Sequence, residues 1–270
     1  MSPEVLLSAM YLEDESFIDT LNIHTDCVVI NQCDRQCDRK TVRPAKNGDI
    51  LVTYIETGER GLSKSRNMAI RNASGPICIL CDNDVEYVSD YDSMINDAFS
   101  RHPDADVIVF FVKRPERDRP VFDRPHKMSW LSVLKIFSPE IAFRKDSVKD
   151  IRFNELFGAG ARFFMGEENL FLYECLRRRL KIVYVPEMIA AVRHNQSTWF
   201  NGYDEAFFVS RGANFAALSG TFSLLLILQY ALRKRRLYKE NLTVPEAVRG
   251  MLKGRRQYFD IVARKRRGSR

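Results

Sequence analysis

Residues 78–84 read CILCDND, an apolar run that ends abruptly in two acids one residue apart. The apolar part begins at Ile77 and has the composition of a buried strand. The carboxylates of Asp82 and Asp84 repel each other, and their charge is costly to remove from water. Two explanations are therefore open: the pair lies in water at a strand end, or a cation binds it there.

Strands and helices alternate around this segment. Short apolar runs predict strands at residues 5–10, 27–31, 50–55, 77–81, 106–112 and 182–186. Helices are expected at about 13–23, 61–72, 90–101 and 166–179, with Ser63 as the N-cap of the second, and the chain past residue 200 is also helical in pattern. Such alternation is typical of a parallel sheet covered on both faces, which binds ligands beyond the carboxyl ends of its strands. We therefore predict an α/β fold with Asp82 and Asp84 at the ligand-binding edge.

The composition is that of a globular protein. The 270 residues are 45% apolar and 29% charged, enough for one large domain or one domain with an extension. We see neither a secretion signal nor an apolar stretch of spanning length, so we expect a cytoplasmic protein with reduced cysteines. Cys78 and Cys81 are three apart on a strand and would point to opposite faces, which favours core packing over a shared metal or disulfide.

The net charge of +7 is concentrated near the C-terminus, in the runs RKRR at 233–236, KGRR at 253–256 and ARKRRGSR at 263–270. No zinc-finger or aromatic RNA-binding motif accompanies these runs, so nucleic acid is not an expected partner. The apolar residues 220–232 directly precede the first run and are too few to span a bilayer. Either this segment lies in the inner face of the membrane as an interfacial helix, or it packs on the rest of the protein.

Residues 61–84, GLSKSRNMAIRNASGPICILCDND, place an Arg-Asn pair on a helix that is followed by a strand and an Asp-x-Asp motif. This segment resembles the family 2 glycosyltransferases, which are inverting enzymes of the GT-A fold. The resemblance implies that Asp82 faces the ribose of a nucleotide and that Asp84, with Asp82, binds Mn²⁺ or Mg²⁺. It also implies donor-binding roles for Lys64, Arg66, Asn67 and Asn83. From the residues alone, an alternative for Lys64, and less so for Arg66, is a solvated charge on an amphipathic helix.

Residues 157–187, FGAGARFFMGEENLFLYECLRRRLKIVYVPE, resemble the acceptor side of the same family. Glu168 occupies the position of the usual catalytic base, where the family more often has Asp, and Glu167 stays a second candidate. Either acid could instead only favour the dipole of the helix that starts here. By the same resemblance His194 is a candidate third metal ligand or diphosphate contact, although a lone His is more often a loop or core residue.

The resemblance is looser at the N-terminus, where the backbone near Ser8 and Met10 and the side chain of Asn31 are candidates to bind the nucleobase. It covers about residues 4–200, so we expect a nucleotide-sugar-binding catalytic domain over 1–200 and a helical basic extension over 201–270.

The implied function is that of a hexosyltransferase in polysaccharide biosynthesis. It would transfer a sugar, with inversion and metal dependence, from a nucleoside-diphosphate sugar (a UDP-sugar favoured) to a hydroxyl of a glycan or lipid-linked acceptor. A nucleotidyltransferase is one alternative, but it would need a Gly- and Lys/Arg-rich loop where residues 11–20 are acidic. A non-enzymatic RNA- or membrane-binding module is the other, and it leaves both acidic motifs unexplained. The sequence does not identify the donor sugar, the acceptor or the linkage.

Overall fold

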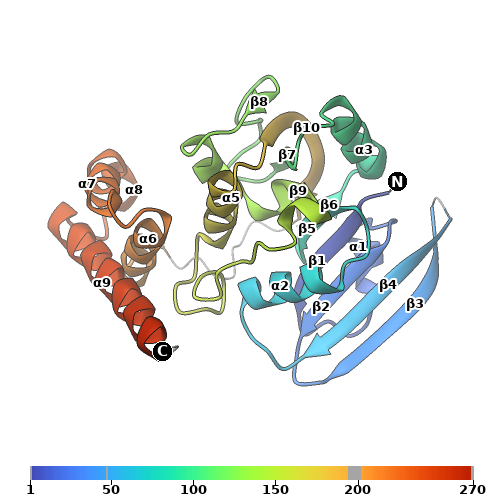
Figure 1. Ribbon diagram of the computed structural model, residues 1–270, viewed down its shortest axis with the longest axis horizontal. Helices are drawn as coiled ribbons and strands as arrows, with labels where there is room; N and C mark the ends of the chain where they lie inside the picture. The colour runs from blue at the N-terminus through green and yellow to red at the C-terminus, as the bar shows by residue number, and fades with distance from the viewer. Residues whose placement is uncertain (1, 47, 194–201, 269–270) are drawn as a thin grey trace.

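The computed structural model describes residues 2–46, 48–193 and 202–268, and it has a central ten-stranded sheet in the order β3-β4-β2-β1-β5-β9-β7-β10-β6, with β8 paired to β10 (Figure 1). The strands are β1 Glu4–Met10, β2 Cys27–Gln32, β3 Cys37–Ala45, β4 Gly48–Thr57, β5 Ile77–Asp82, β6 Val85–Tyr87, β7 Val107–Lys113, β8 His126–Lys127, β9 Ile141–Arg144 and β10 Ile182–Val192. The helices are α1 Phe17–Thr20, α2 Leu62–Asn72, α3 Tyr91–Arg101, α4 Lys145–Val148, α5 Glu167–Arg177, α6 Glu205–Leu218, α7 Ser223–Arg233, α8 Arg235–Tyr238 and α9 Val244–Gly268, with 3-10 turns η1 Ser132–Lys135 and η2 Ser138–Glu140.

The strands β4, β2, β1 and β5 are adjacent and parallel, so their carboxyl ends meet at one edge of the sheet. Asp82 is the last residue of β5 and is paired in register with Ser8 of β1. β3, β6, β8 and β9 add antiparallel pairs around this parallel group. The predicted α/β fold class is confirmed, and Asp82 lies at the predicted edge.

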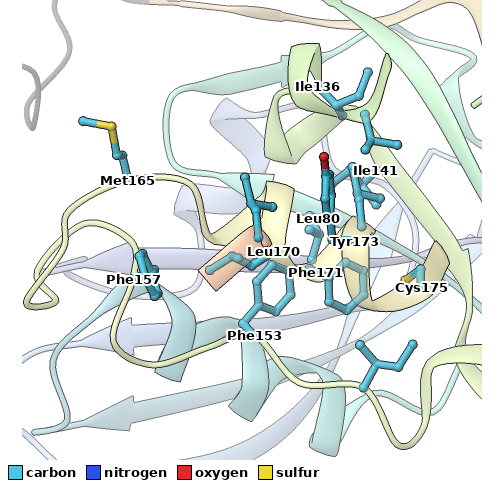
Figure 2. Packing of buried hydrophobic residues seen from close by; sticks show 14 of the residues in the cluster. Leu80, Ile136, Ile141, Phe153, Phe157, Met165, Leu170, Phe171, Tyr173 and Cys175 are labelled. Carbon is cyan, nitrogen blue, oxygen red and sulfur yellow. The ribbon is translucent and has the colours of Figure 1, made fainter. Parts of the chain in front are cut away.

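Apolar side chains pack on both faces of the sheet. On one face, Leu80 of β5 packs with Phe153 and with Leu170 and Phe171 of α5 (Figure 2). Helices α1 and α3 cover the opposite face. Cys78 belongs to the first core and Cys81 to the second, as their spacing on a strand predicts. Since both thiols are buried and free, they act as small apolar core residues.

The structure corrects three local predictions. The helix expected at 13–23 is reduced to α1, because the side chain of Asn31 holds both the N–H and the carbonyl of Leu12 and fixes the preceding loop. Strand β3 was missed because it is an edge strand with mostly exposed, polar side chains. Ser63 is not an N-cap: Gly61 occupies that position, and the Ser63 hydroxyl donates to the carbonyl of Phe157 at 2.7 Å.

The C-terminal helices α6–α9 form a bundle beside α5, on the far side of the molecule from the β3–β4 hairpin (Figure 1). Helices α6 and α9 approach closely at Gly212, where an added Cβ would lie 1.9 Å from the backbone oxygen of Met251. In the part of the chain that the structure describes, no helix is long and apolar enough to cross a membrane.

We predict that Gly212→Ala destabilises the protein by about 1–3 kcal/mol, because the added methyl group forces α6 and α9 apart. In a chain of this size that loss lowers the melting temperature by about 2–4 °C for each kcal/mol. The matched control is Gly58→Ala, where an added Cβ meets nothing within 4 Å. Equal melting temperatures for the two variants would contradict the close helix packing.

Candidate active site

A buried arginine connects the end of β5 to the start of α5. Arg66 of α2 donates from one terminal nitrogen to Asp82 Oδ1 at 2.9 Å and from the other to Glu167 Oε1 at 2.8 Å. The Arg66 side chain is 1% exposed and lies over the ring of Phe153, 5.5 Å from its centroid. The alternative that Arg66 is a solvated surface charge is therefore wrong.

The charge of Arg66 is stabilised by its acidic neighbours. Burial opposes a charged guanidinium, but Asp82 and Glu167 outweigh that effect, and the pKa of Arg66 is raised above its ordinary value. The Arg66 Nε is also buried and has no hydrogen-bond partner among the described residues. Arg66 is thus a permanent cation that holds two acids from different elements in one place.

A glycine positions the two glutamates. Gly166 precedes α5 with φ +86°, a left-handed conformation that side chains disfavour, and an added Cβ would lie 2.2 Å from Asn214 Nδ2 of α6. Asn214 Nδ2 donates to the Gly166 carbonyl oxygen at 3.0 Å. The turn into α5 is therefore held by the C-terminal bundle, and it places Glu167 against Arg66 and Glu168 at a cavity that Arg66 also lines.

A cavity of about 190 Å³ lies at this junction. Its charged lining consists of Arg66, Asp82, Glu167, Glu168 and Arg211. Apolar and small residues from α2, from the η1–η2 region, from the glycine-rich loop at 158–166 and from α6 complete the walls. The end of β5 and the start of α5, which are separate motifs in the sequence, therefore share one site.

The two glutamates differ in their surroundings. Glu167 is 5% exposed and ion-paired with Arg66. Glu168 is half-buried and makes no ion pair with any described Lys or Arg. Burial, and then the neighbouring charge of Glu167, raise the pKa of Glu168 to about 8, although the charges of Arg66 and Arg211 oppose the shift. With a pKa in that range, Glu168 can exchange a proton near neutral pH.

Arg211 of α6 is a cavity residue that the sequence did not indicate. Its guanidinium lies over the rings of Phe207, Tyr230 and Phe215, at 5.5, 5.3 and 6.0 Å from their centroids. Its Nε is buried without a hydrogen-bond partner among the described residues. Only the three-dimensional packing of α6 against α5 reveals its place, because residue 211 lies outside every motif of the sequence.

The predicted nucleobase residues lie at the ends of β1 and β2. The Ser8 side chain accepts a hydrogen bond from the Ser65 hydroxyl at 2.7 Å, and Met10 is exposed. Asn31 is fully buried, and its amide is engaged by Leu12, Tyr54 and, at 3.3 Å, Glu56. The Asn31 side chain therefore organises the loop after β1.

Three further residues were predicted to bind the donor, and only Asn67 among them has a clear structural role. The Asn67 amide exchanges hydrogen bonds with the backbone of Phe153, which fixes the loop that precedes the glycine-rich segment. Lys64 is half-buried at the start of α2, and Asn83 is exposed in the turn after β5. Neither Asn67, Lys64 nor Asn83 lines the cavity that contains Glu168.

Two of the three candidate metal ligands, Asp82 and Asp84, lie at the turn between β5 and β6. Asp82 lines the cavity, whereas Asp84, half-buried two residues later, does not. The carbonyl oxygen of Asp84 accepts a hydrogen bond from the backbone N–H of Arg193 at 2.8 Å. His194 lies outside the described residues, and among the described residues no group of three or more His, Cys, Asp or Glu side chains forms a metal cluster.

We predict that Arg66→Met lowers the free energy of unfolding by about 3–5 kcal/mol, because it leaves Asp82 and Glu167 without their buried counter-ion. Adding Glu167→Gln should restore part of that loss by removing one of the uncompensated charges. Urea unfolding measures both effects, with Arg71→Met, an exposed position on α2, as the control. If Arg66→Met is no less stable than this control, the two ion pairs do not hold the site together.

The family model for glycosyl transferase family 2 matches residues 15–165, more than half of the chain. No curated protein matches the sequence. Among solved structures, Staphylococcus aureus TarS 1–349 superposes with a TM-score of 0.58 at 15% identity, covering 89% of this chain and 74% of that one.

The same TarS fragment in complex with UDP-GlcNAc gives a TM-score of 0.57 at 16% identity, with the same coverage of 89% and 74%. The mannosyltransferase PcManGT from Pyrobaculum calidifontis, in complex with GDP-Man and Mn²⁺, gives 0.51 at 14% identity and covers 94% of this chain and 74% of that one. At these identities the structural likeness establishes the fold, and the family match sets aside the nucleotidyltransferase and the non-enzymatic module. The chain belongs to glycosyl transferase family 2 and is a glycosyltransferase with the GT-A fold.

Proposed function

We propose that the protein transfers a hexose from a nucleoside-diphosphate sugar to an acceptor hydroxyl with inversion, and that Glu168 is the general base. The observation that supports this most strongly is the common cavity of Asp82 and Glu168, in which Glu168 has a raised pKa. An inverting transfer is a single displacement at the anomeric carbon, so it requires one base and no covalent sugar intermediate. One proton-accepting acid beside the end of β5 suits that reaction.

We assign different roles to the two glutamates. Glu167 is held by Arg66 and serves as a positioning residue, since its carboxylate already accepts a charged hydrogen bond at 2.8 Å. Glu168 receives the proton of the acceptor hydroxyl as that oxygen attacks the sugar. The charge of Glu167 keeps the affinity of Glu168 for a proton high, which strengthens Glu168 as a base near neutral pH.

The acids of the β5–β6 turn fit a divalent cation. Mn²⁺ and Mg²⁺ bind oxygen ligands, and Mg²⁺ sites commonly use one or two carboxylates together with substrate phosphates. Asp84 and the Asp82 oxygen that does not face Arg66 provide such ligands. We assign His194 as a further candidate ligand, because its neighbour Arg193 is hydrogen-bonded to Asp84. A bound cation would offset the negative charge of the departing nucleoside diphosphate.

We place the donor at the ends of β1, β2 and β5, with Ser8, Met10, Lys64 and the Asp82–Asp84 turn around it, and favour a UDP-sugar. The acceptor, a hydroxyl of a glycan or of a lipid-linked sugar, would enter on the side of Glu168 and Arg211. The Arg211 Nε, which has no hydrogen-bond partner among the described residues, is our candidate hydrogen-bond donor to it. The catalytic domain at 1–200 and the extension at 201–270 remain our proposed division, although Phe207 and Arg211 of the extension complete the cavity.

We expect Glu168→Gln to reduce kcat by about 10²–10⁴-fold with folding intact, because an amide cannot accept the acceptor's proton. In the wild type, kcat/KM should rise with pH and level off above about 8, since the base must be deprotonated to act. Initial rates over a panel of UDP-, GDP- and CDP-sugars, followed by released nucleoside diphosphate, measure both effects. The control is Glu174→Gln on the solvent-facing side of α5.

Glu167→Gln separates the two glutamates. Removing the charge of Glu167 should shift the rise of kcat/KM to lower pH while turnover persists, because that charge raises the pKa of Glu168. Near-wild-type turnover in Glu168→Gln, or complete loss in Glu167→Gln with wild-type melting behaviour, would reverse the assignment.

We further predict that UDP protects the protein against heat more strongly when Mn²⁺ is present, because a ligand of the native state adds about 2.7 kcal/mol of stability at 100 times its Kd. Asp84→Asn should abolish the Mn²⁺-dependent part of this protection. The matched control is Asp90→Asn. Asp90 is exposed at the N-cap position of α3, and its side chain makes no capping hydrogen bond. Equal protection and turnover in EDTA and in Mn²⁺ would rule out the metal role.

A further inference from the structure

Helix α7 exposes four of its five leucines. The residues that it buries are Ser223, Ile227 and Ala231, which follow one another at a spacing of four. Four of its leucines are 47–67% exposed, namely Leu224, Leu225, Leu228 and Leu232, and Phe222 just before the helix is also exposed. A soluble helix normally turns such residues toward the core, so this face, the α7 leucine face, is available to a partner.

Specific contacts fix the direction in which this face points. Arg255 of α9 donates from Nε to the Ser223 hydroxyl at 2.9 Å. At the other end of the helix, the Tyr238 hydroxyl donates to the carbonyl oxygen of Ala231. Because α7 is anchored at both ends through its small residues, it cannot roll to bury its leucines without breaking these bonds.

A group of cations borders the α7 leucine face. Arg233, Lys234, Arg235 and Arg236 continue directly from the helix, and all four are exposed. None of the four makes an ion pair with a residue that the structure describes, unlike Lys253, which binds Glu205. An apolar surface and an uncompensated positive charge thus occur side by side.

We propose that the α7 leucine face and the cations at 233–236 dock the protein on an anionic lipid surface. Leucines at an interface enter the boundary between headgroups and acyl chains, while flanking cations bind the headgroups, each contributing about fivefold in affinity. At eleven residues α7 is about 17 Å long, too short to cross a bilayer core of about 30 Å, so it would lie in the interface.

A second copy of this chain fits the same face less well. Symmetric pairing through the α7 leucine face would bring the two groups of four cations together if the two helices ran parallel, and would leave both groups without a counter-charge if they ran antiparallel. An anionic lipid surface satisfies both the apolar and the charged component. The charge therefore selects the lipid over self-association.

The docking surface is connected to the cavity through the bundle, since α7 packs on α6, which contains Phe207 and Arg211. If the proposed function holds, docking would keep the acceptor side of the cavity close to the membrane and favour a lipid-linked acceptor. The docking itself does not depend on that function, and its test does not use turnover.

The experiment is co-sedimentation of the full chain with vesicles of phosphatidylcholine alone or mixed with phosphatidylglycerol, at low and at high salt. We expect binding to the anionic vesicles only, weakened by salt because screening shortens the reach of the cations. Leu225→Gln with Leu228→Gln should lower the affinity at least about tenfold, as should glutamine at all four positions 233–236. Surface positions are used so that the variants fold, which their melting temperatures verify.

Matched controls exclude non-specific effects. Val42→Gln with Met188→Gln removes two exposed apolar side chains elsewhere, and the charge control replaces four distant exposed cations, Lys40, Arg71, Arg124 and Lys149. Both controls should bind vesicles as the wild type does. Failure of the wild type to bind, or equal losses in the charge control and in the 233–236 variant, would overturn the proposal. So would light scattering that shows a dimer abolished by the leucine substitutions.

Discussion

The site depends on one buried cation, Arg66, and on the two acids that it holds. Without it, the carboxylate of Glu167 would be buried with no counter-charge and the partly exposed Asp82 would lose its ion pair. The three residues come from α2, β5 and α5, so the ion pairs fix the end of a central strand relative to the start of a helix far along the chain. This constraint places Asp82 and Glu168 in one cavity. A donor bound at Asp82 and an acceptor bound at Glu168 would therefore be neighbours, as a direct transfer requires.

The same constraint explains why two adjacent glutamates differ. Successive residues of a helix point about 100° apart, so when Glu167 turns toward Arg66, Glu168 must face elsewhere. The cavity receives it, and there partial burial and the fixed charge of Glu167 favour its protonated form. Arg66 thus affects the proton affinity of Glu168 in two opposing ways: its own positive charge lowers that affinity, but it also retains the negative charge that raises it. The balance is set by the geometry of the turn at Gly166, which Asn214 supports from the C-terminal bundle.

Sequence patterns predicted the parts of this arrangement that depend on local chemistry. The apolar run before Asp82 located β5, its spacing assigned Cys78 and Cys81 to opposite cores, and the Glu167–Glu168 pair marked the start of α5. The burial of Arg66 could not be deduced, because its partners lie 16 and 101 residues away and its helix otherwise reads as amphipathic. For the same reason Arg211 was missed, since its place depends on how α6 packs. Strand β3 went unrecognised because edge strands tolerate polar residues that give no burial signal.

The C-terminal bundle connects these observations. A helical extension that only stabilised the catalytic domain would need neither an arginine in the cavity nor an amide against Gly166, yet α6 provides both. The glycine contact packs α6 and α9 closely together, and α7 packs on both, so the surface of α7 is joined through α6 to the wall of the cavity. A surface that positions the bundle therefore also positions Arg211 and the turn that presents Glu168. In this arrangement the exposed leucines of α7 are not a defect of packing: burying them would require α7 to rotate, which would break its hydrogen bonds to Tyr238 of α8 and to Arg255 of α9.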